Sequence, residues 1–421
     1  MEKYQFQEIA SSVYAWDLHD EGTECVLDNL QSMANVNSVY LIALMHEERH
    51  PWPNDTFFPH NPCRKEYQTE DSVAYWPAQP ENYGRILPSR PTNFLAGTDW
   101  LGQLGESAKR RGMRFGVEMS HTMLGSDRLA SDCLDVRQVD LFGEPLRRTH
   151  IGENHFVPCM NHPDFRLYVQ NLFREVIKRY NVDYVLNCIM PYPMPAPYLL
   201  VEYEDTIDPR EWILRSPVAS GCFCKSCVEK AKEIGFDLLK ARDGLLKLSE
   251  EAAGTPPLYE TNITPMELLL DHQEFIDWLR FKEYSVSSFY KELHCALHAA
   301  KPDIDNRMNL YITSHSEYAG FRPKKVAKYF DSIRVCVYTE NLGESGLALQ
   351  KRKVLNAARR AFGPGAILHS AIGVLPGATP ESVREGIRVS AECGAQSISL
   401  GHYDGATFEM LKMVGDVAEH R

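Results

Sequence analysis

The sequence lacks an apolar run of the roughly 18–20 residues that a membrane-spanning helix requires. Its first residues also lack the apolar stretch of a secretory signal. We therefore expect a cytoplasmic protein with no membrane partner. Basic charge is in short supply, because 45 lysines and arginines stand against 57 aspartates and glutamates, for a net charge of −12. Such a surface repels phosphate backbones, so nucleic acid is not an expected partner.

Low-complexity segments and an evident linker are missing too. The composition is 44% hydrophobic and 24% charged over 421 residues, an ordinary globular mixture that excludes extended disorder. We predict a single domain over residues 1–421. The eleven cysteines are expected to be thiols or metal ligands, because disulfides seldom persist in the cytoplasm.

What is present is a repeated alternation of short apolar runs with stretches of helical spacing. This pattern predicts parallel strands covered by helices. Eight repeats predict a (β/α)₈ TIM barrel, and a doubly wound open sheet is the alternative, although no glycine-rich phosphate loop supports it. The eight predicted strands are Ser12–Trp16, Ser38–Met45, Met113–Glu118, Asp183–Met190, Asn306–Thr313, Ser332–Tyr338, Ala366–Ile372 and Gln396–His402.

Long loops are predicted after the second, third and fourth strands, at about 46–96, 119–161 and 191–263. In TIM barrels such loops leave the C-terminal rim, where active sites lie. Their Pro, Tyr, Trp and His content suits the walls of a pocket, and the alternatives are stabilising insertions or oligomer contacts. A homo-oligomer is expected because most soluble oligomers are of this kind.

Three cysteines in six residues form the densest chemical signal. Cys222, Cys224 and Cys227 have the spacing of a thiolate metal knuckle, and structural zinc sites are usually four-coordinate. Cys159 is the preferred fourth ligand and Cys188 is second. The alternatives are plain thiols, a disulfide or a redox C-x-x-C motif.

The segment Cys159-Met160-Asn161-His162-Pro163, followed by an amphipathic helix, a strand and C-x-C-x-x-C, resembles the family 42 β-galactosidases and related glycoside hydrolases. The similarity covers about residues 155–235. It implies a (β/α)₈ barrel, a structural zinc held by four cysteines and a sugar-like ligand. It does not extend to the family's two catalytic glutamates, because Asn187-Cys188 and His369-Ser370 stand at those places, and only the asparagine could correspond.

Candidate acids follow other strands. Glycoside hydrolysis usually needs two carboxyl groups, and in a barrel they project from the C-terminal ends of strands. Glu340, after the sixth strand, is the best single candidate, and Glu118 or Asp404 would be its partner. The alternatives are helix capping or structural ion pairs.

Histidines and aromatic residues gather at the same predicted strand ends. They could bind sugar hydroxyls, stack on sugar rings or, for the histidines, hold a second, catalytic divalent metal with Glu118 or Glu340. The predicted substrate-binding residues are His46, His121, Asn187, Tyr192, His315, Tyr338, His402 and Tyr403. His46-Glu47-Glu48-Arg49-His50 matches the H-E-x-x-H protease motif in letters only, because Pro51 ends any helix there.

The sequence therefore predicts a glycoside hydrolase acting on a small glycoside or oligosaccharide by a carboxylate acid/base mechanism. One alternative is a metal-dependent sugar isomerase, epimerase or lyase that uses His46, Glu118, His121 and Glu340. The other is a barrel that binds carbohydrate without catalysis.

Overall fold

The computed structural model describes residues 3–45, 49–50, 58–61, 64–70, 72–119, 123–150, 153–188, 192, 218–253, 265–310 and 316–420. Eight parallel strands close into a barrel, because the last strand pairs with the first and the first pairs with the second. The predicted (β/α)₈ fold is confirmed. The barrel strands are β2 (Glu8–Val13), β3 (Ser38–Met45), β7 (Arg114–Met119), β10 (Tyr184–Cys188), β11 (Asp305–Leu310), β12 (Ser332–Val335), β13 (Ile367–Ile372) and β14 (Ser397–Leu400).

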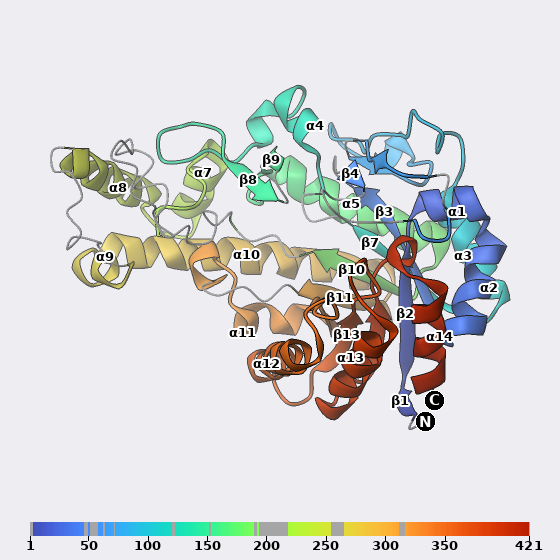
Figure 1. The fold of residues 1–421 in the computed structure, drawn as a ribbon. Helices are drawn as coiled ribbons and strands as arrows, with labels where there is room; N and C mark the ends of the chain where they lie inside the picture. Colours follow the sequence, from blue (N-terminus) through green and yellow to red (C-terminus); the bar gives the residue numbers. More distant parts are fainter. Residues whose placement is uncertain are drawn as a thin grey trace.

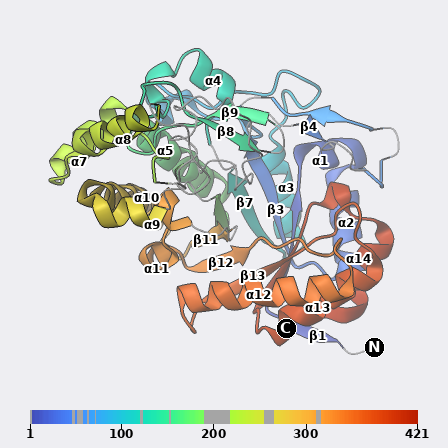
Figure 2. The same ribbon diagram turned by 60° about the vertical axis from the view of Figure 1, so that its left-hand side comes forward.

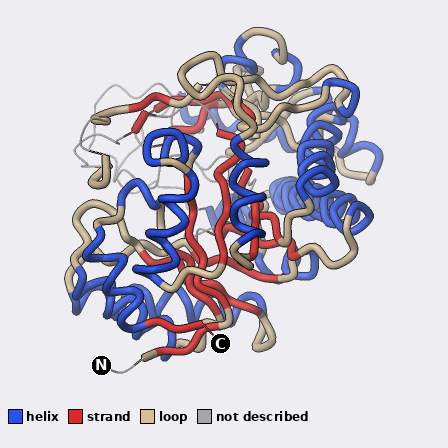
Figure 3. Tube along the Cα trace, turned by 90° about the vertical axis from the view of Figure 1, so that its right-hand side faces the viewer, coloured by secondary structure: helices blue, strands red, loops and turns tan. Residues whose placement is uncertain are grey.

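Helices surround these strands (Figures 1 and 3). The α-helices are α1 (Ala15–Glu21), α2 (Thr23–Ala34), α3 (Trp100–Arg110), α4 (Ser126–Ala130), α5 (Pro163–Tyr180), α7 (Lys225–Glu233), α8 (Leu238–Ala253), α9 (Pro265–Asp271), α10 (Gln273–Ala300), α11 (Pro323–Val326), α12 (Glu344–Phe362), α13 (Pro380–Glu392) and α14 (Phe408–Val417). Short 3₁₀ helices are η1 (Pro80–Asn82), η2 (Leu134–Val136), η3 (Ser316–Ala319), η4 (Ala327–Tyr329) and η5 (Tyr403–Gly405). Within the described ranges, no helix has the length and apolar character needed to cross a bilayer.

Several short strands lie in addition to the eight strands of the barrel. β1 (Tyr4–Phe6) pairs with β15 (Ala418–His420) and brings the two ends of the described chain side by side (Figure 3). The others lie in the long segments that follow barrel strands: β4 (Arg49–His50), β5 (Tyr67–Gln68), β6 (Val73–Ala74), β8 (Arg147–His150) and β9 (Glu153–Phe156). Helices α7, α8 and α9 group beside the N-terminal part of α10 at one side of the barrel (Figures 1 and 2).

The prediction for the first strand is wrong in its bounds. The strand covers Glu8–Val13, and Trp16 lies in the helix that follows it. The side chain of Asp17 accepts a 2.8 Å hydrogen bond from the backbone N–H of Tyr14 and so caps this helix. The sequence signal was weak because the residues facing the lumen include Ser12, and polar inward residues interrupt the apolar run.

The N-terminal end of the lumen is closed by a buried ion-pair network. The Arg307 guanidinium donates bonds of 2.6 and 2.8 Å to the two carboxylate oxygens of Glu8, and both side chains are 2% exposed. Burial would raise the pKa of Glu8, but the charge and hydrogen bonds of Arg307, with the charges of His369 and Arg114, together outweigh it and hold this pKa far below its usual range. The ring of Tyr184 lies 3.7 Å below the guanidinium. This end of the barrel is therefore a packed plug.

Gly116 on β7 makes room for that plug, since a Cβ there would overlap the ring of Tyr184. Tyr184 cannot move freely, because its hydroxyl bonds Ser38 Oγ at 2.7 Å. We expect Gly116→Ala to lower the free energy of unfolding by about 1–3 kcal/mol through overpacking, measured by urea denaturation. Gly365→Ala is the control, because no atom lies within 4 Å of a Cβ built there. Equal stability of the two variants would contradict this account.

Candidate functional site

Glu118 lies in the lumen near the C-terminal end of β7, where the sequence predicted it. Asn309 Nδ2 donates a 2.8 Å hydrogen bond to Glu118 Oε1, and the Cys188 sulfur lies 3.8 Å from the same oxygen. Burial raises the pKa of Glu118, although the charge of Arg334 opposes the shift. Burial therefore favours the protonated form of this carboxyl group, which is the form that a general acid needs.

A hydrogen-bond network crosses the lumen beside Glu118. The Arg334 guanidinium donates to Asn309 Oδ1 at 2.7 Å and to Ser399 Oγ at 3.0 Å, and it also bonds the hydroxyl of Tyr338. The Ser399 hydroxyl lies 3.2 Å from the hydroxyl of Tyr40. Two of the predicted residues, Glu118 and Tyr338, therefore belong to one group.

His402 lies at the mouth of the same lumen. Its Nδ1 is 3.1 Å from the hydroxyl of Ser12, which also forms a side-chain hydrogen bond with Tyr40. The ring of His402 packs against Tyr14, with centroids 4.9 Å apart. The network that begins at Glu118 thus continues to His402.

Asp404 is buried beside a second carboxyl group that the sequence did not single out. Trp16 Nε1 donates to Asp404 Oδ2 at 3.2 Å, while Asp404 Oδ1 has no hydrogen-bond partner within the described chain. Burial raises the pKa of Asp404 to about 7. Burial, and then the charge of Asp404, raise the pKa of Asp17 well above its usual range. The two carboxyl groups are thus not ionised together near neutral pH.

This pair makes a pH-dependent contribution to stability. The folded-state pKa of Asp404 lies above its ordinary value of 3.8, so the contribution is complete below about pH 4 and is lost as the pH rises through about 7. It is worth up to about 1.4 kcal/mol for each pH unit between the two values. We expect Asp404→Asn to flatten the fall in melting temperature between pH 4 and 8. Asp303→Asn, at an exposed turn, should keep the wild-type profile, and a wild-type profile in Asp404→Asn would contradict the assignment.

Glu340 lies in a different environment from Glu118. Its Oε1 is 2.7 Å from Lys351 Nζ, and its Oε2 accepts a 2.9 Å bond from the backbone N–H of Gly373. Lys351, on α12, also donates to the carbonyl oxygens of Val337 and Ala371, at 3.0 and 2.7 Å. Both charged side chains are at most 1% exposed. Glu340 therefore forms a buried ion pair between the barrel wall and its helices.

Three other predicted residues also lie away from the Glu118 network. Asn187 Nδ2 donates to Asn306 Oδ1, on the face of β10 opposite to its inward neighbours Leu186 and Cys188. The hydroxyl of Tyr192 lies beside the cysteine cluster. The hydroxyl of Tyr403 donates to Glu21 Oε2 at 2.8 Å. His46, His121 and His315 lie outside the described residues, so the proposed second metal stays a prediction.

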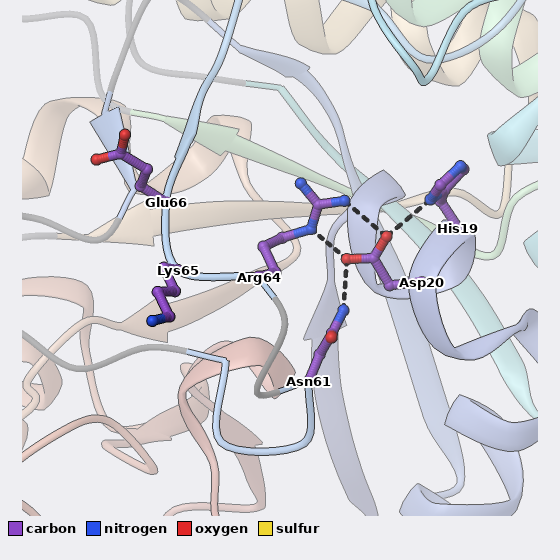
Figure 4. Close-up of a pocket in the computed structure, with 6 residues that line it drawn as sticks. All are labelled: His19, Asp20, Asn61, Arg64, Lys65 and Glu66. Atoms are coloured by element: carbon purple, nitrogen blue, oxygen red, sulfur yellow. Dashed lines mark hydrogen bonds and ion pairs between the residues drawn. The ribbon is translucent and has the colours of Figure 1, made fainter.

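A polar pocket lies on the same end of the barrel, at α1 and the segment that follows β3 (Figure 4). Its centre is Asp20, whose Oδ1 accepts from Arg64 Nη2 at 2.7 Å and whose Oδ2 accepts from Asn61 at 2.7 Å. Burial would raise the pKa of Asp20, but hydrogen bonds from Arg64 and His19 outweigh it and lower the pKa. The cavity is about 580 Å³ and is lined by His19, Asp20, Asn61, Arg64, Lys65 and Glu66.

The cysteine cluster forms as the sequence predicted, with Cys159 as its fourth member. The sulfur atoms of Cys159, Cys222, Cys224 and Cys227 all lie within 4.8 Å of one another, and all four residues are buried. Burial and the neighbouring thiols raise the pKa of Cys222, while hydrogen bonds from the other thiols lower that of Cys224. Four thiols packed without a disulfide are a donor set that fits a tetrahedral thiophilic metal ion.

Outer contacts hold the cluster in place. Asn161 Nδ2 lies 3.3 Å from the Cys227 sulfur and donates to Ser285 Oγ on α10 at 2.9 Å, while Arg166 bonds Asn161 Oδ1 at 3.0 Å. The asparagine of the Cys-x-Asn motif thus supports the ligands. Two further α10 side chains, Trp278 and Lys282, donate to the carbonyl oxygens of Val218 and Ser220, just before the first cysteine of the knuckle.

Arg334, Asn309 and Asp17 were not predicted from the sequence. A sequence signal existed for Arg334 and Asn309. Polar residues recur at every second position along β11 and β12, as Arg307 and Asn309 show on β11. This pattern marks a strand face that is turned to a polar interior. Asp17 carried no comparable signal, because its partner Asp404 lies at the other end of the chain.

No family model and no curated protein sequence matches the chain. Solved structures share its fold. An α-L-fucosidase from Paenibacillus thiaminolyticus aligns with a TM-score of 0.57 and 13% identity over 98% of this chain and 48% of that one. A β-galactosidase from Bacillus circulans aligns with a TM-score of 0.55 and 14% identity, over 98% and 55% of the two chains.

A GH42 β-galactosidase from G. stearothermophilus gives a TM-score of 0.57 and 14% identity, over 98% of this chain and 57% of that one. The chain thus spans about half the length of these neighbours. The likeness establishes a barrel shared with glycoside hydrolases and confirms the resemblance in fold to the family 42 β-galactosidases.

Proposed function

We propose that this protein is a glycoside hydrolase acting on a small glycoside or oligosaccharide, with Glu118 as its general acid. The observation that carries the proposal is a buried carboxyl group near the C-terminal end of a barrel strand, with its pKa raised by burial. Active sites of TIM-barrel enzymes lie at this end. The shared barrel of two kinds of glycosidase supports the same substrate class.

In this mechanism the protonated Glu118 donates its proton to the glycosidic oxygen as the bond to the anomeric carbon breaks. The Asn309 amide holds one carboxyl oxygen, and Arg334 fixes Asn309 from its other side. Tyr338 and His402 bind sugar hydroxyls at the mouth of the lumen. Glu340 and Asp404 are left out of the acid/base pair because each is buried among contacts of its own.

The four cysteines are proposed to hold a structural zinc ion. Zinc supplies no chemistry to the reaction in this scheme, since an all-thiolate site leaves no open position. Cys159 precedes α5, whereas the other three ligands lie at the start of α7. A bound ion would therefore tie the long segment after β10 to the segment that precedes α5.

The test measures hydrolysis of a panel of 4-nitrophenyl glycosides that includes galactosides and fucosides. The release of 4-nitrophenol reports the rate. We expect wild-type turnover and a loss of about 10²–10⁴-fold in kcat for Glu118→Gln. Glu175→Gln is the matched control, because Glu175 is equally buried but bonds Trp76, Gln79 and Tyr83 outside the lumen. Binding of sugars without turnover would favour the non-catalytic barrel instead.

A further inference from the structure

A thiol lies beside the Glu118 network, directly after the end of β12, which is the second strand along the barrel wall from β10. Cys336 follows the last residue of β12, and its backbone N–H continues the ladder with a 2.8 Å bond to the carbonyl oxygen of Leu310. It lies two positions after Arg334, so its side chain points to the same lumen. The C-terminal ends of barrel strands are the places from which catalytic groups project.

The guanidinium of Arg334 is in direct contact with this thiol. Arg334 Nη1 lies 3.0 Å from the Cys336 sulfur. The guanidinium cannot swing away, because it also bonds Ser399 and Tyr338. A fixed cation against the sulfur stabilises the thiolate, which is the nucleophilic form of cysteine.

One amide group separates this thiol from Glu118. The Cys336 thiol donates a 2.7 Å hydrogen bond to Asn309 Oδ1, and Asn309 Nδ2 donates to Glu118 Oε1 at 2.8 Å. The Cys336 sulfur and Glu118 Oε1 are joined through this one amide by hydrogen bonds of 2.7 and 2.8 Å, which keeps the two groups close together in the lumen.

Charge in the lumen also favours one distribution of the proton. Arg334 touches the sulfur directly but reaches Glu118 only through Asn309. Once the thiol has lost its proton, the guanidinium at 3.0 Å therefore stabilises a charge on sulfur more directly than a charge on the Glu118 carboxyl group. A glycosidase needs this state, with an ionised nucleophile beside a protonated acid.

The other lumen thiol is less suited to this role. The Cys188 sulfur lies 3.8 Å from Glu118 Oε1, beside a carboxyl group rather than a guanidinium. Burial raises the pKa of Cys188 well above its usual range. Cys188 is therefore expected to stay a neutral thiol.

We propose that Cys336 is the nucleophile of this enzyme and forms a covalent thioglycosyl intermediate, a role that rests on the proposed glycosidase function. The Cys336 thiolate attacks the anomeric carbon, a C–S bond forms, the glycosidic C–O bond breaks, and the leaving oxygen takes the proton of Glu118. The Glu118 carboxylate then removes a proton from water, whose oxygen attacks the same carbon. The C–S bond breaks and the thiolate returns, so one water cleaves one glycoside with no oxidant or reductant.

The direct test traps the intermediate on the wild-type protein. The chain is incubated with the 2,4-dinitrophenyl 2-deoxy-2-fluoro derivative of whichever sugar it cleaves fastest in the nitrophenyl panel, and digested peptides are analysed by mass spectrometry. We expect the fluorosugar on the peptide that holds Cys336. Its attachment to an aspartate or glutamate would overturn the assignment and leave the glycosidase function standing.

Two variants give an independent measurement. Cys336→Ser is expected to lower kcat by about 10³-fold or more, with an unchanged melting temperature. Cys133→Ser, which replaces a buried cysteine outside the lumen, should keep wild-type activity. Full activity in Cys336→Ser would overturn the assignment of Cys336 as the nucleophile and leave the proposed glycosidase function standing. Failure of the wild-type protein to cleave any glycoside would overturn the proposed function, and the nucleophile with it.

Iodoacetamide labelling tests the thiolate without any substrate. At pH 6.5 we expect Cys336 to be alkylated before the exposed Cys25 and Cys295, because a thiolate reacts much faster than a neutral thiol. Arg334→Lys should slow the labelling of Cys336 and leave that of Cys25 unchanged. Labelling of Cys336 no faster than that of the exposed cysteines would also overturn the proposal.

Discussion

Removal of the metal from the cysteine cluster is expected to be the most damaging single change to this protein. The purified chain should contain one zinc ion, measured by plasma mass spectrometry, and Cys222→Ser should abolish it. Structural zinc sites contribute apparent binding free energies of about 10–16 kcal/mol in small domains. Here the surrounding barrel provides its own core, so we expect a loss of several kcal/mol and early proteolysis within residues 218–236.

The choice of fourth ligand gives this prediction its control. Cys159→Ser should lose zinc as Cys222→Ser does, because the Cys159 sulfur lies 3.4 Å from that of Cys224 and 3.5 Å from that of Cys227. Cys188→Ser should retain the metal, because Cys188 faces the lumen beside Glu118. Zinc retained in Cys159→Ser, or lost in Cys188→Ser, would contradict the assigned ligand set.

Lys351→Met is expected to cost about 3–5 kcal/mol, because it leaves the Glu340 carboxylate buried without its cation. The two charges are 2.7 Å apart and both are almost fully buried. Melting temperature and urea denaturation measure this loss. The double variant Lys351→Met with Glu340→Gln should recover part of it, because no uncompensated charge remains.

The same pair separates a structural role of Glu340 from a catalytic one. If Glu340 acts only through Lys351 and Gly373, Glu340→Gln lowers stability while kcat per folded molecule stays near the wild-type value. A fall in kcat of about 10²-fold or more, with the protein still folded, would instead restore Glu340 as the catalytic carboxylate that its sequence position suggests.

The barrel and the cysteine cluster could be predicted because their signals are local. Helix α13, for example, begins at Pro380 directly after the N-cap residue Thr379, whose side chain accepts a bond from the N–H of Ser382, and such a cap with a first-turn proline can be read from the sequence. The C-x-C-x-x-C spacing likewise brings three thiols together by local geometry. The fourth ligand, Cys159, precedes α5 in a separate segment, so spacing alone left Cys188 open as a second choice.

The direction of individual side chains could not be predicted in the same way. A shift of one residue turns a strand side chain from the lumen to the helices. Asn187 points outward and Cys188 inward for this reason. Glu340 appeared at the correct end of its strand, but its orientation depends on Lys351, which is on the next helix and carries no sequence signal that links it to an acid.

Helix α10 links the cysteine cluster to the end of β10, which borders the barrel lumen beside Glu118. Ser285 accepts a bond from Asn161 at the cluster, and Tyr290, five residues later, donates a 2.9 Å bond from its hydroxyl to the carbonyl oxygen of Cys188. The two anchor points are about 7–8 Å apart along one stiff rod. Removal of the ion is therefore expected to displace the end of β10. Metal content and turnover would then fall together, even though no ligand of the ion takes part in bond cleavage.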